Sequence, residues 1–342
     1  MAGLALSGVR VAGFQGARPG KVVIAGGGII GASIAYGLAR RGADVTLLER
    51  AVPGTGTTAN SFAWINAKKQ PLAYHALSQL GIGAWRVLDD ETKGALPLMW
   101  GGSLEWISDA AVAARVAEVN RQYMRWGYPL RPMDAAQMAA LEGSVRFEGL
   151  RYGAHAEAEA SVDPQGATDV IISYAKAAGA RVVYPATVTG LDRQGGRLRG
   201  VRATTGDLAA DVLVICCGND TPGVAKLAGI EVPLTRSAGI LVHTRPQPRA
   251  IDRVLLSPLG QIKQKRNGSI VAGADFGPTS NEDTSIGRGE QFLRRMSTVL
   301  PDLGAALSGL LEEGLGREPA RRFSAKVTAS ALGLGYERAY LA

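Results

Sequence analysis

Residues 22–49 of the chain read VVIAGGGIIGASIAYGLARRGADVTLLE, and this stretch decides the fold class. The opening run VVI is typical of a strand that is buried on both faces of a parallel sheet. An apolar helix is predicted for residues 32–41, and a second strand for residues 44–49. Between the first strand and the helix lies the glycine pattern GxGxxG, which consists of Gly26, Gly28 and Gly31. The stretch is therefore a complete βαβ unit of the kind that binds dinucleotides.

Each glycine of the pattern has its own physical task. The first allows a tight turn, the second lets the backbone approach a pyrophosphate, and the third lets the helix pack closely on the strand. The helix N-terminus then presents N–H groups and a positive dipole end to the diphosphate. Glu49 ends the second strand, where its carboxylate can accept hydrogen bonds from both ribose hydroxyls. The alternative is a glycine-rich turn between strand and helix with an exposed glutamate. It is disfavoured because such a turn does not require a strand, glycines, a helix, a second strand and an acidic residue to follow one another in this order.

Length and composition limit the class of protein. A chain of 342 residues exceeds what one hydrophobic core usually serves, so two domains are expected. With 46% hydrophobic and 20% charged residues, the chain is not globally disordered. The two cysteines, Cys216 and Cys217, are adjacent, which excludes a disulfide-stapled secreted scaffold and favours a reducing, cytoplasmic setting.

Charge and hydropathy exclude two further classes. The net charge is +8, but Lys and Arg are scattered among acidic residues, so no nucleic-acid partner is predicted. Residues 22–39 carry no charge and are long enough to imitate a membrane span. Five of them are glycines, however, and a buried strand, turn and helix is the better interpretation, so no transmembrane segment is predicted. Residues 1–20 are expected to be a disordered leader and not a signal peptide.

The rest of the chain alternates helices with short strands. Helices are predicted for residues 72–88, 109–126, 134–141, 165–178 and 288–300. Strands are predicted for residues 181–184, 187–192, 198–204, 211–217, 239–243, 261–265 and 269–274. The last three have the texture of an antiparallel sheet with one open face. The predicted fold class is α/β, with a Rossmann-like parallel sheet into which an antiparallel sheet with helices is inserted.

The fingerprint alone leaves NAD and FAD open, and the sequence after Glu49 distinguishes them. Residues 53–66 read PGTGTTANSFAWIN, a Gly/Ser/Thr-rich segment. Here the chain resembles the flavin-dependent amine oxidoreductases of the D-amino-acid oxidase, glycine oxidase and sarcosine oxidase superfamily. Further resemblance lies in SVDP at residues 161–164, ATVTGL at 186–191 and DVLVICCG at 211–218. An NAD-dependent dehydrogenase is disfavoured because it has no role for the segment at residues 53–66.

The resemblance implies non-covalent FAD as the cofactor and a discontinuous cofactor domain. That domain would comprise residues 21–85, 151–235 and 305–342, and the substrate domain residues 86–150 and 236–304. The positions expected to contact FAD are Gly26, Gly28, Ile29, Ile30, Gly31, Glu49, Arg50, Thr57, Thr58, Asn60, Val188, Cys217 and Gly218. The main chain near Val188 would meet the adenine. Cys216 and Cys217 stand where the family has small residues, so they are interpreted as packing residues.

The chemistry that the resemblance implies is hydride transfer from the carbon next to an amine to flavin N5. The resulting imine hydrolyses to a carbonyl compound and ammonia or an amine. The substrate would be a D-amino acid, glycine or an N-methyl amino acid, and the electron acceptor oxygen or a quinone-type carrier. Arg317 is the first candidate to bind a substrate carboxylate, and Lys263 and Lys265 are weaker ones. No metal and no nucleophilic triad is expected, and His75, His155 and His243 are interpreted as structural.

The C-terminal sequence departs from the family pattern. After Pro319 the family would continue to a Gly-rich segment that opens a final helix facing the flavin, whereas this chain has Gly333 and Gly335 in a different context. The end of the chain is therefore interpreted as truncated. Loss of that helix would remove a positive dipole from the reduced flavin. The alternative function is accordingly a non-catalytic flavin-binding remnant, and the oligomeric state is open.

Overall fold

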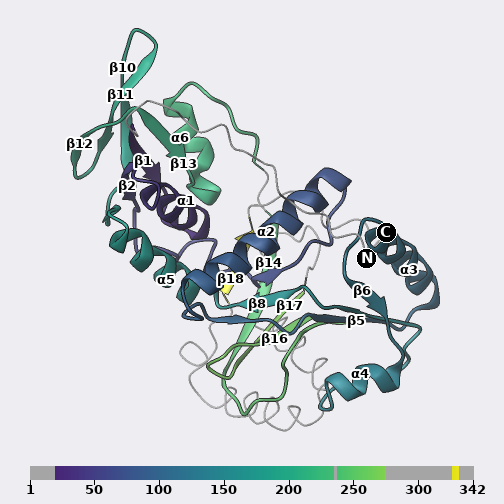
Figure 1. Cartoon of the computed structure of the whole chain (residues 1–342). Helices are drawn as coiled ribbons and strands as arrows, with labels where there is room; N and C mark the ends of the chain where they lie inside the picture. The colour runs from purple at the N-terminus through teal and green to yellow at the C-terminus, as the bar shows by residue number, and fades with distance from the viewer. Residues whose placement is uncertain (1–19, 235–236, 275–325, 331–342) are drawn as a thin grey trace, which may run out of the picture.

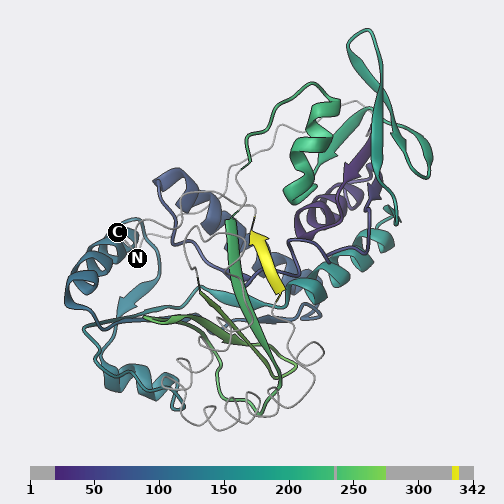
Figure 2. The same cartoon turned by 180° about the vertical axis from the view of Figure 1, so that it is seen from behind.

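The chain forms two lobes, each built on its own sheet (Figure 1). The computed structural model describes residues 20–234, 237–274 and 326–330. One lobe contains a four-stranded sheet and the other an eight-stranded sheet. The view from behind shows the same two lobes (Figure 2). Helix α2 (Leu72–Glu91) lies between them in Figure 1.

The smaller lobe contains the predicted βαβ unit. Its strands, in order across the sheet, are β13 (Val212–Ile215), β1 (Lys21–Ala25), β2 (Asp44–Leu48) and β9 (Arg181–Val183). All neighbouring pairs are parallel. Helix α1 (Ile29–Ala39) buries Ala32, Ala35 and Ala39 in the same core as Ile24 of β1 and as helix α5 (Pro164–Ala177). These small side chains allow the helix to approach the sheet closely. The parallel Rossmann-like architecture predicted from residues 22–49 is confirmed.

A three-stranded antiparallel meander packs against the parallel sheet of the smaller lobe. It consists of β10 (Val188–Gln194), β11 (Arg197–Ala203) and β12 (Gly206–Ala209). The turn between β10 and β11 is Gly195-Gly196, and both glycines have positive φ, 57° and 77°. Such a pair suits a two-residue hairpin, as the sequence indicates. Val188 and Val201 pack with Val23 of β1 in a second hydrophobic cluster, which joins the meander to the parallel sheet.

The larger lobe is a mixed sheet. Its order is β18 (Lys326–Ser330), β14 (Ser237–Pro246), β17 (Ser269–Ala274), β16 (Gly260–Gln264), β15 (Val254–Ser257), β5 (Ser103–Ile107), β7 (Tyr152–Ala156) and β6 (Leu130–Pro132). The pairs are antiparallel except β15 with β5, which is parallel. The antiparallel pairing predicted for the strands at residues 239–243, 261–265 and 269–274 is therefore confirmed in β14, β16 and β17.

Short elements complete the described chain. A small antiparallel sheet joins β3 (Trp64–Ile65), β8 (Ala160–Val162) and β4 (Leu98–Met99). The remaining helical elements are α3 (Ala110–Arg125), α4 (Ala135–Leu141), α6 (Thr221–Leu227) and the 3₁₀ turn η1 (Gly218–Asp220). Asp134 and Gln137 form the capping box that the sequence indicates at the start of α4.

The predicted helices at 72–88, 109–126, 134–141 and 165–178 correspond to α2, α3, α4 and α5, with ends that shift by up to three residues. The strands with no counterpart among the predicted ones are β3, β4, β5, β6, β7, β8, β12, β15 and β18. The sequence of β7, YGAHA, lacks the β-branched residues that usually mark a strand.

The domain limits remain a prediction. Strand β7 pairs with β5 of the larger sheet, although the expected boundary at residue 151 assigned it to the cofactor domain. Helix α2 likewise runs across the expected boundary at residue 85. Of the expected leader at residues 1–20, residues 1–19 lie outside the described residues, as do the expected helix at 288–300 and Arg317. Within the described residues, no helix is long and apolar enough to cross a membrane.

Candidate functional site

The glycine turn between β1 and α1 is closed by backbone contacts. The Gly26 N–H donates to the Leu48 carbonyl at 2.8 Å, and Gly26 has a φ of 104°. A Cβ on Gly26 would lie 2.3 Å from the Cys216 carbonyl oxygen. A Cβ on Gly31 would lie 1.9 Å from the Gly26 carbonyl oxygen. Both positions therefore require glycine, and the tasks assigned to the first and third glycines fit this geometry.

Glu49 lies directly beside this turn. Its Oε2 accepts from the Gly27 N–H at 2.7 Å and its Oε1 from the Ala51 N–H at 2.9 Å. The Glu49 backbone is fixed as well, because its N–H donates to the Val183 carbonyl and its carbonyl accepts from Ala186. A carboxylate has further acceptor sites for hydroxyl groups after these two bonds. The position suits the ribose contact expected for Glu49.

The segment after β2 folds back over the N-terminus of α1. The Gly54 N–H donates to the Gly27 carbonyl at 2.9 Å, and Thr58 Oγ1 accepts from the Ile29 N–H at 3.1 Å. Gly28, the N-cap of α1, offers no side chain, and the first turn contains no acidic residue. The first turn of α1 thus brings no carboxylate of its own to its N–H groups, which favours an anion such as a diphosphate there.

Three further positions expected to contact the cofactor lie outside the glycine turn between β1 and α1, namely Arg50, Gly218 and Val188. Arg50 pairs with Asp220 across a distance of 2.8 Å. Gly218 has a φ of 54°, and a Cβ there would lie 3.3 Å from Thr57 Oγ1. The side chain of Val188 is buried in the core, which leaves only its main chain for a ligand.

Ile30 and Asn60 occupy contrasting positions. Ile30 is a large apolar side chain on the first turn of α1, and 60% of it is exposed. Asn60 donates its Nδ2 to the Gly56 carbonyl at 3.0 Å, while its Oδ1 is buried and accepts no hydrogen bond. A buried amide oxygen without a donor is costly, so a ligand donor at this point would stabilise the segment.

The two cysteines behave as packing residues. Both are free and half-buried, and the Cys217 thiol donates to the Ala25 carbonyl at 3.3 Å. Burial, with a further contribution from Cys216, raises the pKa of Cys217 to about 11. The thiol is therefore protonated and unreactive at neutral pH.

The lysines proposed for a substrate carboxylate already have partners. Lys263 is 1% exposed, and its Nζ donates to the carbonyls of Val162 and Ala63 at 2.7 and 3.0 Å. Burial, assisted by the charge of Lys265, lowers the pKa of Lys263 to about 7. Lys265 pairs with Asp163 at 3.3 Å. Both ammonium groups are engaged by these partners, so their role as ligands of a substrate carboxylate stays a prediction.

Sequence reasoning missed a group of buried charges next to the segment at residues 64–69. Lys68 Nζ lies 3.0 Å from Glu105 Oε2, and both side chains are almost fully buried. Glu159, which is fully buried, accepts from the Trp64 indole and the Tyr128 hydroxyl, each at 2.7 Å. Burial raises the pKa of Glu159, although the Lys68 charge opposes this rise. The only sequence signal was the pair of lysines, Lys68 and Lys69, inside an apolar segment.

His75 and His155 lie in buried positions where they serve packing. His75 is buried, with Nδ1 against the Ala67 carbonyl and Nε2 against the Gln79 amide, and it stacks on Tyr123. His155 is also buried, and desolvation lowers its pKa. Among the residues that the structure describes, no three His, Cys, Asp or Glu side chains form a group that could hold a metal ion.

A family model described as "FAD dependent oxidoreductase" matches residues 21–319 of the chain. The chain belongs to this family. The family consists of FAD-dependent amino-acid and amine oxidases and dehydrogenases, and FAD is the cofactor. The glycine cradle and the unpartnered Asn60 oxygen fit such a dinucleotide.

Individual relatives have low sequence identity to this chain. Human mitochondrial dimethylglycine dehydrogenase is 26% identical over 277 residues, which cover 77% of this chain and 31% of that protein. The uncharacterized oxidoreductase YurR of Bacillus subtilis (strain 168) is 27% identical over 303 residues, with coverage of 83% and 79%. The chain thus spans about a third of the dimethylglycine dehydrogenase.

Solved structures share the fold. L-proline dehydrogenase from P. horikoshii superposes with a TM-score of 0.76 at 20% identity, and covers 84% of this chain and 79% of its own. Glycine oxidase from Bacillus cereus ATCC 14579 has a TM-score of 0.73 at 18% identity, with coverage of 84% and 79%.

Proposed function

We propose that the chain oxidises the C–N bond of a small amino acid, namely glycine, a D-amino acid or an N-methyl amino acid. The observation that carries this proposal is the closed glycine turn with Glu49 and the segment at residues 53–66 folded over it. The relatives support the substrate class, since dimethylglycine dehydrogenase and the 4-methylaminobutanoate oxidase of Paenarthrobacter nicotinovorans are both named for N-methylated amino acids. N-methyl amino acids are therefore the first substrates to test.

The residues of the smaller lobe would hold the cofactor non-covalently. Thr58 and the N-terminus of α1 would hold the diphosphate, and the Glu49 carboxylate would accept the ribose hydroxyls. Residues 60–66 would continue toward the flavin ring. Bound FAD supplies the acceptor for the hydride that leaves the carbon next to the amine. The protein positions substrate and ring, and no described side chain is needed as a nucleophile.

The electron acceptor and the compartment complete the proposal. Oxygen and a quinone-type carrier are both compatible with the site. The free thiols of Cys216 and Cys217 support a reducing, cytoplasmic setting.

An absorbance spectrum tests the cofactor, and anaerobic titration tests the substrate. We expect flavin bands in the purified protein or after reconstitution with FAD. Under anaerobic conditions sarcosine, dimethylglycine, glycine or D-alanine is expected to bleach the flavin, and L-lactate, which has no amine, is the control. Absence of flavin bands after reconstitution would refute the cofactor assignment. Flavin that binds but is bleached by no member of the amine panel would favour the non-catalytic remnant.

Substitution of Thr58 by valine tests the cofactor segment itself. The variant loses the hydroxyl that accepts from the Ile29 N–H. We expect FAD to bind roughly fivefold more weakly, because one hydrogen bond contributes about 1 kcal/mol. Flavin fluorescence on titration of the apoprotein measures this change. Thr55→Val is the matched control, since the Thr55 hydroxyl donates only to the Val52 carbonyl on the exposed side of the same segment. Equal affinities of the two variants would contradict the role of Thr58.

A further inference from the structure

Lys263 occupies the joint between the cofactor-facing segment and the larger sheet. It projects from β16, and its Nζ contacts two carbonyls, that of Ala63 at 3.0 Å and that of Val162 at 2.7 Å. The Phe62 ring covers the ammonium, with its centroid 5.2 Å from Nζ. Three segments that lie about 100 and 200 residues apart in sequence therefore meet at one amine.

This arrangement is unusual for a buried lysine. A buried ammonium is normally stabilised by a carboxylate in direct contact. The carboxylate of Asp163 acts on Lys263, but Asp163 is already paired with Lys265. The charge of Lys263 is held by carbonyl dipoles and a ring face instead. Retention of so costly a group points to a task that an apolar side chain of the same length would not perform.

The carbonyl that Lys263 holds belongs to a special backbone position. Ala63 has a φ of 54°, which is uncommon for a residue other than glycine. Its carbonyl accepts from the Val162 N–H at 3.2 Å as well as from Lys263. Directly after Ala63 the chain enters β3 and pairs with β8. The Lys263 ammonium therefore joins the end of the segment at residues 53–66 to β16 of the larger sheet.

We propose that Lys263 is a positioning residue that holds the segment at residues 53–66 on the larger sheet before the cofactor arrives. This inference rests on the proposed function, because it assigns that segment to FAD. A segment that is already ordered binds its ligand with a smaller loss of conformational entropy. Lys263 would thus act on cofactor affinity through Ala63 without touching the cofactor.

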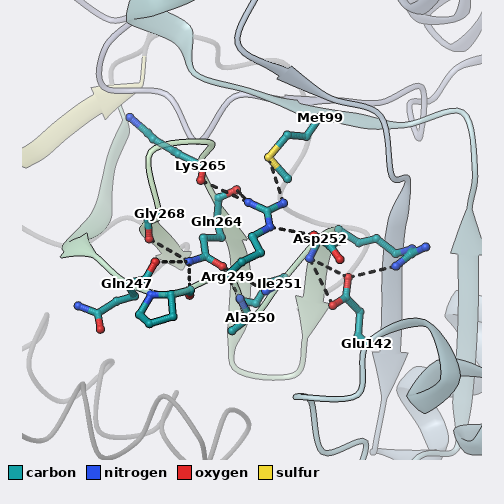
Figure 3. A network of polar contacts seen from close by, with 12 residues as sticks. Met99, Glu142, Gln247, Arg249, Ala250, Ile251, Asp252, Gln264, Lys265 and Gly268 are labelled. Carbon is teal, nitrogen blue, oxygen red and sulfur yellow. Dashed lines mark hydrogen bonds and ion pairs between the residues drawn. The ribbon is translucent and has the colours of Figure 1, made fainter.

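The strand that carries Lys263 is held independently of this contact. Its neighbour Gln264 is buried, and its side chain binds the loop at residues 247–251 and the carbonyl of Gly268 (Figure 3). Arg249 adds bonds to the carbonyls of Gln264 and Lys265. The Lys265 side chain points away from this network (Figure 3). Replacement of Lys263 therefore removes the contact to Ala63 and leaves β16 in place.

The test uses the variants Lys263→Met and Lys265→Met in the full chain. Methionine keeps the length of the side chain and removes its N–H donors. The first readout is amide hydrogen exchange at residues 62–66 of the apoprotein, and the second is the FAD dissociation constant. We expect Lys263→Met to raise both by about tenfold or more, because a hydrogen bond to a charged group is lost. Lys265→Met removes the pair with Asp163 and a like charge near Lys263, but no hydrogen bond to Ala63 or Val162, and is expected to change either by less than about threefold.

The outcomes separate this inference from the proposed function. Unchanged exchange at residues 62–66 in Lys263→Met overturns the positioning role, whether or not FAD binds. If the wild-type chain binds no FAD, the proposed function fails, and the role of Lys263 toward the cofactor fails with it. Lys263→Leu also has no N–H donor and serves where Lys263→Met does not fold. Faster exchange at residues 62–66 in Lys263→Leu supports the positioning role, and a rate equal to wild type overturns it.

Discussion

Replacement of Gly31 by alanine is expected to abolish FAD retention and to lower the free energy of unfolding by about 1–3 kcal/mol or more. The new Cβ would lie 1.9 Å from the Gly26 carbonyl oxygen, which is far inside van der Waals contact. Neither atom is the end of a flexible side chain, so α1 must move away from β1. That movement displaces the Ile29 N–H and the dipole end that would face the diphosphate. Urea unfolding and the flavin content after gel filtration measure the two effects.

Gly37 provides the matched control within the same helix. A Cβ there would meet the Arg41 guanidinium at 3.6 Å, an ordinary contact. Gly37→Ala should leave FAD binding unchanged and stabilise the protein by up to about 1 kcal/mol, since alanine favours a helix over glycine. Equal behaviour of the two variants would show that the close approach of α1 to β1 is not what Gly31 provides.

The fold around this glycine could be predicted because its determinants are local. Strand, turn, helix and acid follow one another within residues 22–49, and each has a periodicity or a backbone requirement that is visible in the sequence. The alternation of β16 likewise placed Lys263 and Lys265 on one face of a strand. What that face meets could not be predicted, because Ala63 and Val162 approach it from distant parts of the chain. Long-range partners of this kind leave no local pattern.

The buried charges show the same limit more strongly. Lys68, Glu105 and Glu159 would each be interpreted as surface residues from composition alone. The structure buries all three, and burial is tolerable only because they are paired with one another or with hydrogen-bond donors. Burial opposes the charge of Lys68, but the carboxylates of Glu105 and Glu159 outweigh it and raise the pKa of Lys68. The two carboxylates therefore stabilise the charged form of the buried Lys68.

Removal of one member of this pair should be among the most damaging changes in the chain. Lys68→Met leaves Glu105 buried without its cation, while the Asn120 amide still donates to the same Oε2 at 3.0 Å. We expect the free energy of unfolding at pH 7 to fall by about 3–5 kcal/mol. Glu159 cannot relieve this loss, because it loses the same neighbouring cation. Urea denaturation followed by far-UV circular dichroism measures the change.

A double-mutant cycle shows that the loss arises from the pair itself. Lys68→Met combined with Glu105→Met removes both charges of the pair, and the double variant should recover at least about 1 kcal/mol relative to the single one, because the Glu105 carboxylate is no longer buried without its cation. The exposed pair of Arg121 and Glu118, 2.7 Å apart on α3, is the control. Arg121→Met should cost less than about 1 kcal/mol, since solvent screens that pair. If Lys68→Met lowers the free energy of unfolding no more than Arg121→Met, the pair of Lys68 and Glu105 does not hold the segment at residues 64–69 to the larger sheet.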